Sequence, residues 1–504
     1  MHLFVCRFFI CLHLLLPIHS FSQQLVWSDA ARNERAIEHV QAVAQIDTVL
    51  HIIEEREDHN LRHVRYGWNS MRVLHSTDIQ PTDNDTKPEY FYILGDTLHI
   101  LSTRWNRTED CTEVLASSYD SEGKMVGAEV LVHKRFEPGE PRKSGLQCTV
   151  SPNDSLLLLY FDSENERKQS EGIHFKCYRP DWKMVWEKDL RLPPAGDILQ
   201  VHHFLLDNEG CVYMMSGRKP LKTSSDWQRP QGGQYVVYYY NYKLNKLKQY
   251  DISLKDKQVI SVDFVMNKKQ DVLIAGYYSD NFQNKAAGTL LFTIGNHGGI
   301  IQTASYTPFS RDFIKEMTGK EKGTPEYFYL DHLHVSAAGT IVLAGEQYYT
   351  SRYISTDPTT GRQLVEYRYN FDDIMLCMMD SSARHLHTLR IPKRQFTSDT
   401  NDPNFSYAFT ADDEHISITF NDDEENNLSE PSKKWQETAL WSGSKVSVTT
   451  RVQLSYDGSW TRRTLVDNNN ERLLFNPLMQ PIDPWASDVL GFDDKRSYKF
   501  CRIR

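Results

Sequence analysis

The amino-acid sequence predicts an all-β protein, a β-propeller of four-stranded blades. Three observations predict it: a strand–turn–strand unit recurs along most of the chain, a second hairpin follows each copy, and the turns carry Gly, Asn and Asp. These turn residues supply the positive φ that tight hairpins need. Four strands per repeat, at a period of about 60 residues, is typical of propeller blades. Aromatic residues, 12% of the chain, also favour strands.

Six copies of the unit follow one another and fill residues 89–467. The first hairpins cover 89–104, 146–161, 202–217, 262–277, 331–346 and 406–421. The second hairpins cover 114–132, 175–190, 235–254, 290–306, 374–391 and 448–466. Equivalent turn positions lie 56, 60, 69 and 75 residues apart, at Ser151, Asp207, Asn267, Ser336 and Ala411. The hairpins keep their length, so the growth lies in the loops between strands.

The two ends of the chain are expected to close the ring. Residues 23–88 predict a partly helical segment, with a helix after Ser28 that places Ile37, Val40 and Ala44 on one face, and one closing strand near 71–75. Residues 468–504 supply three closing strands. An open blade edge would leave backbone groups unpaired, so we expect a composite blade from both termini. Seven blades are favoured; in the alternative with six, the C-terminal strands cap one face.

Residues 1–22 predict a signal peptide. Arg7 precedes an apolar run, and Pro17 and small residues follow before Gln23. The run is too short to span a bilayer, and no later stretch is long enough. We therefore expect an exported protein, periplasmic or extracellular, with no membrane span. The net charge of -10 argues against nucleic acid and anionic membranes as partners.

Six cysteines remain after the predicted signal peptide is removed. An even count in an exported protein permits disulfides. Most of the six lie inside apolar, strand-like runs, as in Cys211-Val212-Tyr213, and no Cys-x-x-Cys pair occurs. This placement predicts buried free thiols for most of them rather than a zinc or redox site.

Several stretches of the last two thirds of the chain resemble a known family. They are AGEQYY (344–349), YRYNFDDIMLC (367–377), IPKRQ (391–395) and FNDD (420–423). Together they are similar to an uncharacterised family of exported β-propeller proteins from Bacteroidota-type bacteria. The resemblance implies the same fold and compartment, and it carries over no catalytic residue.

The central channel is the first candidate site, because the innermost strand of each blade lines it. Four residues before each equivalent turn position stands a polar residue, and an apolar residue follows, as alternation in a strand requires. The polar residues are Gln147, His203, Asp263, His332 and Tyr407. Gathered at one level they would bind an anionic sugar or a divalent metal ion. A solvated channel with polar walls gives the same pattern, and a register slip of one residue would remove the ring.

An aromatic-rich loop in the fifth repeat is the second candidate site. Tyr348, Tyr349 and Tyr353 fall in a stretch, 347–371, that lengthens this repeat. Aromatic side chains on a loop offer a platform for sugar rings or a peptide, and propellers bind through the loops outside their sheets. Aromatic residues at strand ends also pack blades together, which is the alternative.

The sequence favours a binding protein over an enzyme. No Gly-x-Ser-x-Gly or His-Glu-x-x-His motif occurs. We expect a non-catalytic exported propeller, without a cofactor, that binds an envelope protein or a polysaccharide through a loop-built face. The alternative is a polysaccharide lyase or glycoside hydrolase with its site in the channel, because paired carboxylates from distant blades leave no local motif.

Overall fold

The computed structural model describes most of the chain beyond the predicted signal peptide. The described residues are 25–29, 31–32, 37–56, 60–79, 86–94, 97–120, 122–136, 146–162, 172–192, 199–218, 235–280, 285–320, 323–356, 361–398, 404–428, 447–479, 488–493 and 497–503. The signal peptide expected over residues 1–22 lies outside them.

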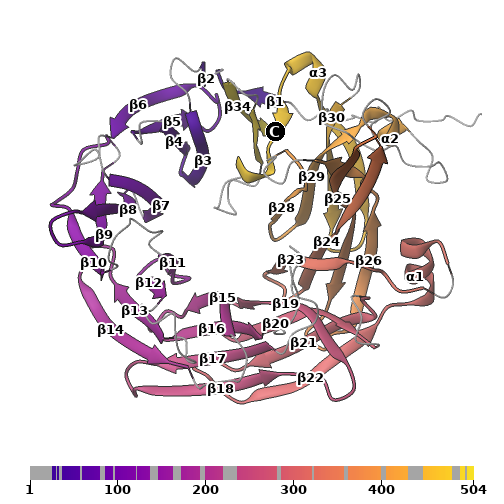
Figure 1. Cartoon of the computed structure of the whole chain (residues 1–504), viewed down its shortest axis with the longest axis horizontal. Coiled ribbons are helices and arrows are strands. Elements are labelled where there is room, and N and C mark those ends of the chain that lie inside the picture. The colour runs from indigo at the N-terminus through magenta and orange to yellow at the C-terminus, as the bar shows by residue number, and fades with distance from the viewer. Residues whose placement is uncertain are drawn as a thin grey trace, which may run out of the picture.

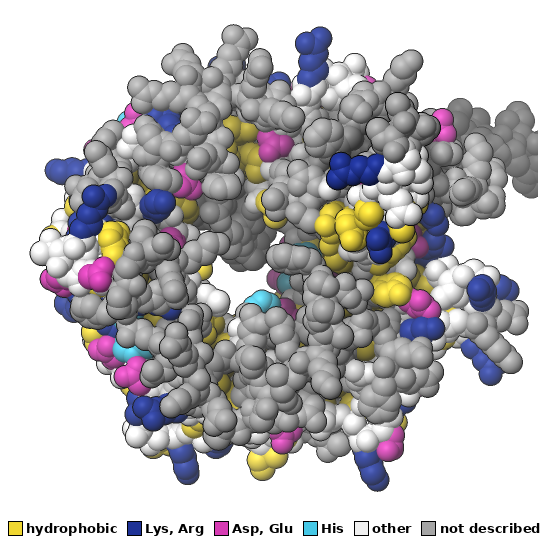
Figure 2. Space-filling model, in the orientation of Figure 1, with side chains coloured by type: hydrophobic (Ala, Val, Ile, Leu, Met, Phe, Trp, Pro, Cys, Tyr) yellow, Lys and Arg dark blue, Asp and Glu magenta, His cyan; other side chains and the backbone are white. Residues whose placement is uncertain are grey.

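Within the described residues the strands form eight antiparallel sheets, arranged in a ring around a central opening (Figures 1 and 2). Seven sheets each come from one consecutive stretch of chain. The first two sheets are β3 (Ile37–Ile46), β4 (Val49–Arg56), β5 (Leu61–Gly67), β6 (Val73–Ile79), and β7 (Thr86–Leu94), β8 (Thr97–Asn106), β9 (Cys111–Tyr119), β10 (Val130–Phe136). The next two are β11 (Gln147–Val150), β12 (Leu157–Asp162), β13 (Gly172–Tyr178), β14 (Met184–Arg191), and β15 (Leu199–Leu206), β16 (Val212–Arg218), β17 (Tyr235–Asn241), β18 (Lys246–Ile252).

Three more consecutive sheets complete this series. They are β19 (Gln258–Met266), β20 (Val272–Ser279), β21 (Gly288–Ile294), β22 (Ile301–Pro308); β23 (Phe328–Val335), β24 (Ile341–Thr356), β25 (Gln363–Met379), β26 (His385–Ile391); and β28 (Ala408–Ala411), β29 (His415–Asp423), β30 (Ser447–Ser455), β31 (Trp460–Asp467). A short strand, β27 (Gln395–Thr397), adds to the free edge of β25. The described helices are short: α1 (Arg311–Thr318), α2 (Glu424–Leu428), α3 (Asn468–Glu471) and the 3-10 turn η1 (Pro477–Met479).

The eighth sheet joins the two ends of the chain. Its C-terminal strands are β32 (Leu474–Phe475), β33 (Val489–Asp493) and β34 (Ser497–Ile503). The N-terminal strands β1 (Leu25–Trp27) and β2 (Ala31–Arg32) both pair with β34. The predicted all-β propeller, with six internal repeats and a composite blade from both termini, is confirmed. The described strands form one sheet more than the favoured seven, because residues 37–79 build a sheet of their own.

The helix expected to include residues 37–44 is wrong, since these residues belong to β3. Two bulges explain the misleading pattern: the register of β3 against β4 shifts between Ile37 and His39 and again between Ala42 and Ala44. Each bulge adds a residue and breaks the alternation of a strand, so the apolar positions acquire a spacing close to that of a helix. The closing strand expected near 71–75 is wrong too: β6 is the last strand of its own sheet, and β1 closes the ring.

Hydrophobic clusters fill the interfaces between neighbouring sheets. On one side of the composite sheet, Phe475 and Phe492 pack with Val466 of β31. On its other side, Phe500 and Tyr498 pack with Tyr66 and Leu50 of the β3–β6 sheet. Six further clusters join the remaining pairs of neighbours. The composite sheet therefore packs between the β3–β6 sheet and the β28–β31 sheet, and this packing closes the ring.

The six cysteines of the described chain are free, and five of them are buried: Cys111, Cys177, Cys211, Cys377 and Cys501. Burial raises the pKa of the Cys177 and Cys501 thiols to about 12, so both stay protonated at neutral pH. None of the described helices has the length and apolar character needed to cross a membrane.

Replacing Phe492 by alanine tests whether the composite sheet belongs to the cooperative core. The side chain is 0% exposed, so Phe492→Ala should lower the free energy of unfolding by about 3–5 kcal/mol, measured by urea unfolding. Leu244→Ala, at a turn residue that is 71% exposed, serves as the control and should change it by about 0.5 kcal/mol or less. Equal effects of the two substitutions would contradict a closed ring.

Candidate functional site

The strands nearest the central opening are the first strands of the sheets, among them β11, β15, β19, β23 and β28 (Figure 1). The expected channel residues lie on or beside these strands. Gln147, His203, Asp263 and His332 hold the same place, paired with the next strand three steps before the hairpin turn. The equivalent position in the sixth repeat is Ala408, which pairs with Thr419.

Tyr407 is therefore one residue out of register with the other four. The β28–β29 turn closes with a hydrogen bond from Asp412 N to His415 O, whereas the β15–β16 turn closes from Asp207 N to Cys211 O. The shorter turn makes Asp412, not Ala411, the residue equivalent to Asp207. Because side chains alternate along a strand, Tyr407 points to the opposite face, where it is buried against the fifth repeat.

Four of the five predicted channel residues contact one another, and they do so in two separate pairs. His203 Nδ1 lies 2.8 Å from Asp263 Oδ1, across neighbouring sheets. The His332 ring stacks on Phe409 at 4.9 Å and meets Tyr407 edge-on at 5.3 Å. Gln147 forms no hydrogen bond or ion pair with the other four within the described chain. The five predicted channel residues therefore do not come together in one cluster.

His203 is the exposed member of these pairs, with 63% of its side chain accessible. The hydrogen bond that His203 Nδ1–H donates to the Asp263 carboxylate raises the pKa of His203, since it favours the charged imidazole. Desolvation acts in the other direction on His332 and lowers its pKa. An imidazole oriented by a carboxylate through Nδ1 leaves Nε2 for a proton transfer or a ligand. Figure 2 shows histidine and acidic side chains at the rim of the opening.

The loop predicted to carry Tyr348, Tyr349 and Tyr353 is instead part of two long strands. β24 and β25 continue past the rest of their sheet as a two-stranded hairpin, pairing from Tyr348 opposite Phe371 to Thr356 opposite Gln363. We call residues 348–356 and 363–371 the hairpin extension. Tyr348 lies on one face of it, whereas Tyr349 and Tyr353 lie on the other. The three tyrosines therefore do not form one platform.

The face that carries Tyr348 is the larger apolar surface, which we call the hairpin apolar face. Cross-strand partners share a face, and this one comprises Tyr348, Ile354, Val365, Tyr367, Tyr369 and Phe371. Toward the end of the extension Ile354, Val365 and Tyr367 are 56, 45 and 50% exposed. Figure 2 shows hydrophobic side chains gathered next to basic ones over β24 and β25. The alternation of Tyr367, Tyr369 and Phe371 is the sequence signal for this face, and it indicates a strand where a loop was predicted.

The opposite face is held by a basic residue. The Arg368 guanidinium lies 4.5 Å from the Tyr353 ring centre and 4.7 Å from that of Phe396, on β27. Arg368 also donates to Glu366 at 3.3 Å. These contacts cover this face in part, and they fix the orientation of the extension.

A buried ion pair anchors the base of the hairpin extension. The Lys393 ammonium group, 0% exposed, lies 2.6 Å from Glu346 Oε1. It also donates hydrogen bonds to Phe371 O at 2.7 Å and to Gln395 Oε1 at 2.9 Å. Ser406 Oγ donates to Glu346 Oε2 at 2.9 Å. Burial raises the pKa of Glu346, and the lysine opposes that shift.

A bulge beside this ion pair starts the extension. The register shifts between Glu346 and Tyr348, and two carboxylates of β25 occupy the irregular part. Tyr349 Oη donates to Asp372 Oδ2 at 2.9 Å, and Arg390 pairs with Asp373 at 2.8 Å. Both carboxylates are thus used to hold the bulge, which re-aims the strands away from the sheet.

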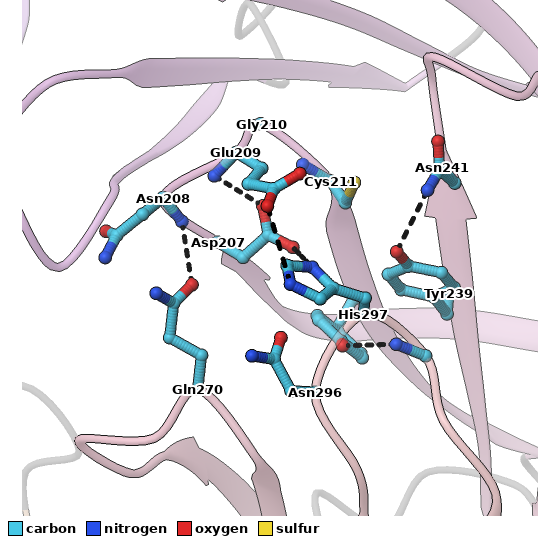
Figure 3. A network of polar contacts seen from close by, with 12 residues as sticks. Asp207, Asn208, Glu209, Gly210, Cys211, Tyr239, Asn241, Gln270, Asn296 and His297 are labelled. Carbon is cyan, nitrogen blue, oxygen red and sulfur yellow. Dashed lines mark hydrogen bonds and ion pairs between the residues drawn. The ribbon is translucent and has the colours of Figure 1, made fainter.

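A polar cluster links hairpin turns of the third and fourth repeats (Figure 3). Asp207 is buried, and its Oδ1 accepts from the backbone N–H groups of Glu209 and Cys211 at 2.9 and 2.8 Å. His297, from the next sheet, lies with Nε2 3.4 Å from Glu209 Oε1. Burial raises the pKa of Asp207. The contacts tie one hairpin turn to its neighbour, which is a structural role.

One group of described residues has the composition of a metal site. Ligand atoms of Glu109, Cys111 and Glu113 lie within 4.8 Å of one another. Cations of the chain already neutralise the two carboxylates: Arg104 lies 2.7 Å from Glu113, and Lys134 pairs with Glu109. Burial raises the pKa of the Cys111 thiol. The group is best described as an ion-pair cluster at the end of the β8–β9 hairpin.

No protein-family model and no curated protein matches the chain. Solved structures similar to it include the Dos1 propeller, with a TM-score of 0.43, 9% identity and 95% of each chain covered. The polysaccharide lyase Uly1 has a TM-score of 0.38 and 11% identity, with 93% of this chain and 99% of that chain covered. The β-propeller domain of the Trilobed protease from Pyrococcus furiosus has a TM-score of 0.37 and 9% identity, with 86% and 98% covered.

The chain spans 55% of the length of a prolyl endopeptidase that it also matches. These identities and TM-scores are low, and the class of the protein, a β-propeller, follows from its own ring of antiparallel sheets.

Asp263→Asn should lower the pKa of His203 toward the ordinary value of about 6.5, because the charged hydrogen-bond acceptor is lost. NMR titration of the His203 ring measures this, with Asp280→Asn as a control carboxyl that pairs with Lys257 instead. The raised pKa means that the pair stabilises the folded chain below the ordinary histidine pKa, and that this contribution disappears as the pH rises through the folded value. An unchanged pKa in Asp263→Asn would exclude the pair.

Lys393→Met should lower the free energy of unfolding by about 3–5 kcal/mol, because it leaves the Glu346 carboxylate buried without its partner. The double variant Lys393→Met, Glu346→Gln should recover part of that loss, since the uncompensated charge is gone. Chemical unfolding of the two single variants and the double variant gives the coupling. Strictly additive losses would show that the two groups do not interact.

Proposed function

We propose that the protein is an exported, non-catalytic β-propeller that binds an envelope protein through the hairpin apolar face. The observation that carries the proposal is the exposure of Ile354, Val365 and Tyr367 on strands that run past their sheet. Contiguous exposed apolar side chains are uncommon on proteins that act alone, and they mark interaction surfaces.

The hairpin apolar face is built to hold its shape. Its base packs into the ring: the Tyr348 and Phe371 ring centres are 5.0 Å apart, and Phe371 lies 5.9 Å from Phe405. Lys393 and the bulge fix the same end. A surface that is ordered before binding loses little conformational entropy when a partner docks.

The composition of the face favours a protein over a polysaccharide. Ile354 and Val365 are aliphatic, offer no hydrogen bond and cannot stack on a sugar ring. Tyr367 stands opposite Arg352 on the same face, and tyrosine and arginine are enriched where proteins meet. The signal peptide predicted over residues 1–22 supports a partner in the cell envelope or outside the cell.

Site-specific photocrosslinking in cells that make the protein natively tests the proposal. A benzophenone amino acid in place of Tyr367 should give one discrete adduct with a single protein, identified by mass spectrometry. The same group in place of Leu244, which is 71% exposed on a distant turn, should not give it. No adduct at Tyr367, the same adducts at both positions, or a protease-resistant glycan adduct would each contradict a protein partner at this face.

The His203–Asp263 pair favours a second candidate, a polysaccharide lyase or glycoside hydrolase with its site in the channel. An exposed imidazole held by a carboxylate is a suitable general base. A divalent metal ion bound by His203 and His332 belongs to the same candidate. Turnover of a glycan that is lost in His203→Ala, or a stoichiometric metal that is lost in His203→Ala, His332→Ala, would favour the channel over the hairpin extension.

A further inference from the structure

Among the described strands, none pairs with the outer edge of β24 along the hairpin extension. β23 pairs with β24 only as far as Phe328 opposite Gln347. From Tyr348 to Thr356 the described strands pair β24 with β25 alone. The other edge of the extension is different, because β27 pairs with residues 369–371 of β25. One edge of this small sheet is thus extended by a strand, and the other is open.

The orientation of the open edge follows from one hydrogen bond. Tyr348 N donates to Tyr327 O at 3.1 Å, on the side of β24 that faces β23. The register of β24 against β25 is regular from Tyr348 onward. Backbone groups alternate between the two sides of a strand, so those of Thr350, Arg352 and Ile354 point to the open edge.

The sequence of this edge carries little of the usual protection against strand pairing: one charged side chain, Arg352. Residues 348–356 read Tyr-Tyr-Thr-Ser-Arg-Tyr-Ile-Ser-Thr, with neither proline nor lysine. Edge strands are commonly protected by those residues or by bulges. The tyrosines, threonines and isoleucine of this stretch instead have high strand propensity. A regular open edge of this composition fits an added strand, and only a polypeptide supplies donors and acceptors at the matching spacing.

We propose that two copies of this chain pair antiparallel through their β24 edges, about a two-fold axis at Ser351. In this register Thr350 of one copy and Arg352 of the other exchange both backbone hydrogen bonds, and symmetry repeats the pair. Tyr349 then lies directly opposite Tyr353 of the second copy, an aromatic pair of the kind that stabilises sheets. The strand is thus complementary to itself.

Charge selects this register over its neighbour. An axis at Arg352 would place the two guanidinium groups directly opposite each other, which is destabilising. The axis at Ser351 places each Arg352 opposite a threonine. Strands β27, β25 and β24 of one copy and the same three strands of the other would then form one continuous six-stranded sheet. This inference does not depend on the proposed partner, since edge pairing leaves the hairpin apolar face of each copy exposed.

Sedimentation equilibrium of the chain without its predicted signal peptide (residues 23–504) tests the pairing. We expect a monomer–dimer equilibrium. Thr350→Pro removes an N–H that points to the open edge, hence two of the four hydrogen bonds between Thr350 and Arg352 of the two copies, and should weaken association by about tenfold or more. Thr350→Val keeps the N–H and the branched side chain and should dimerise as the wild type does. Circular dichroism checks that both variants fold.

A disulfide tests the register itself. Ser351 would face its own copy in a non-hydrogen-bonded pair, where the Cα atoms lie about 4.5 Å apart, within reach of a disulfide. Ser351→Cys should therefore form a covalent dimer under mild oxidation. Ser355→Cys, on the same strand but away from the axis, should not. A wild-type chain that stays monomeric, or a dimer that Thr350→Pro leaves intact, would overturn the proposal.

Discussion

Pairing of β1 with β34 is the interaction on which the ring depends. β34 is held on its other side by β33, and β1 supplies the strand that the C-terminal segment lacks. Ser28 secures this contact twice: its N–H donates to Phe500 O, and its Oγ accepts from Phe500 N. The composite sheet then presents one apolar face to each neighbour. Without β1, much of one edge of β34 would be open, and the sheet that joins β3–β6 to β28–β31 would lose a strand.

The closed ring makes the hairpin extension possible. A two-stranded hairpin alone is marginally stable in water, so the hairpin extension needs support from the sheet that it leaves. That support comes from polar groups that the ring has already buried: Lys393 bonds to Phe371 O, and Glu346 marks the last residue before the bulge. The pair is expensive to desolvate, and the two hydrogen bonds that the ammonium group donates to Phe371 O and Gln395 Oε1 offset part of that cost. The buried Lys393–Glu346 pair thus has a structural role: it fixes the direction in which β24 and β25 leave the sheet.

The sequence predicted the features that repeat and missed those that break the repeat. The six hairpin pairs and the terminal closure follow from alternation and turn residues, and all of them are present. The sheet of residues 37–79 was missed because two bulges in β3 disguise its alternation. Tyr407 was placed one residue out because the turn at Asp412 is shorter than the others. The full length of the strands of the hairpin extension cannot be predicted from the sequence, because their pairing is local and no length rule predicts a 17-residue strand such as β25.

The channel and the hairpin extension differ in how much side-chain surface they leave available to bind a partner. In the channel, Tyr407 is buried against His332, and Asp263 is bonded to His203. Of the two histidines described there, His203 is the exposed one, with 63% of its side chain accessible, and its Nδ1 is already paired with Asp263. On the extension, by contrast, Ile354, Val365 and Tyr367 expose apolar surface whose burial would be favourable by about 25 cal/mol per Å². Because binding has to offset the loss of translational freedom, the surface with more to bury is the better candidate for a stable complex.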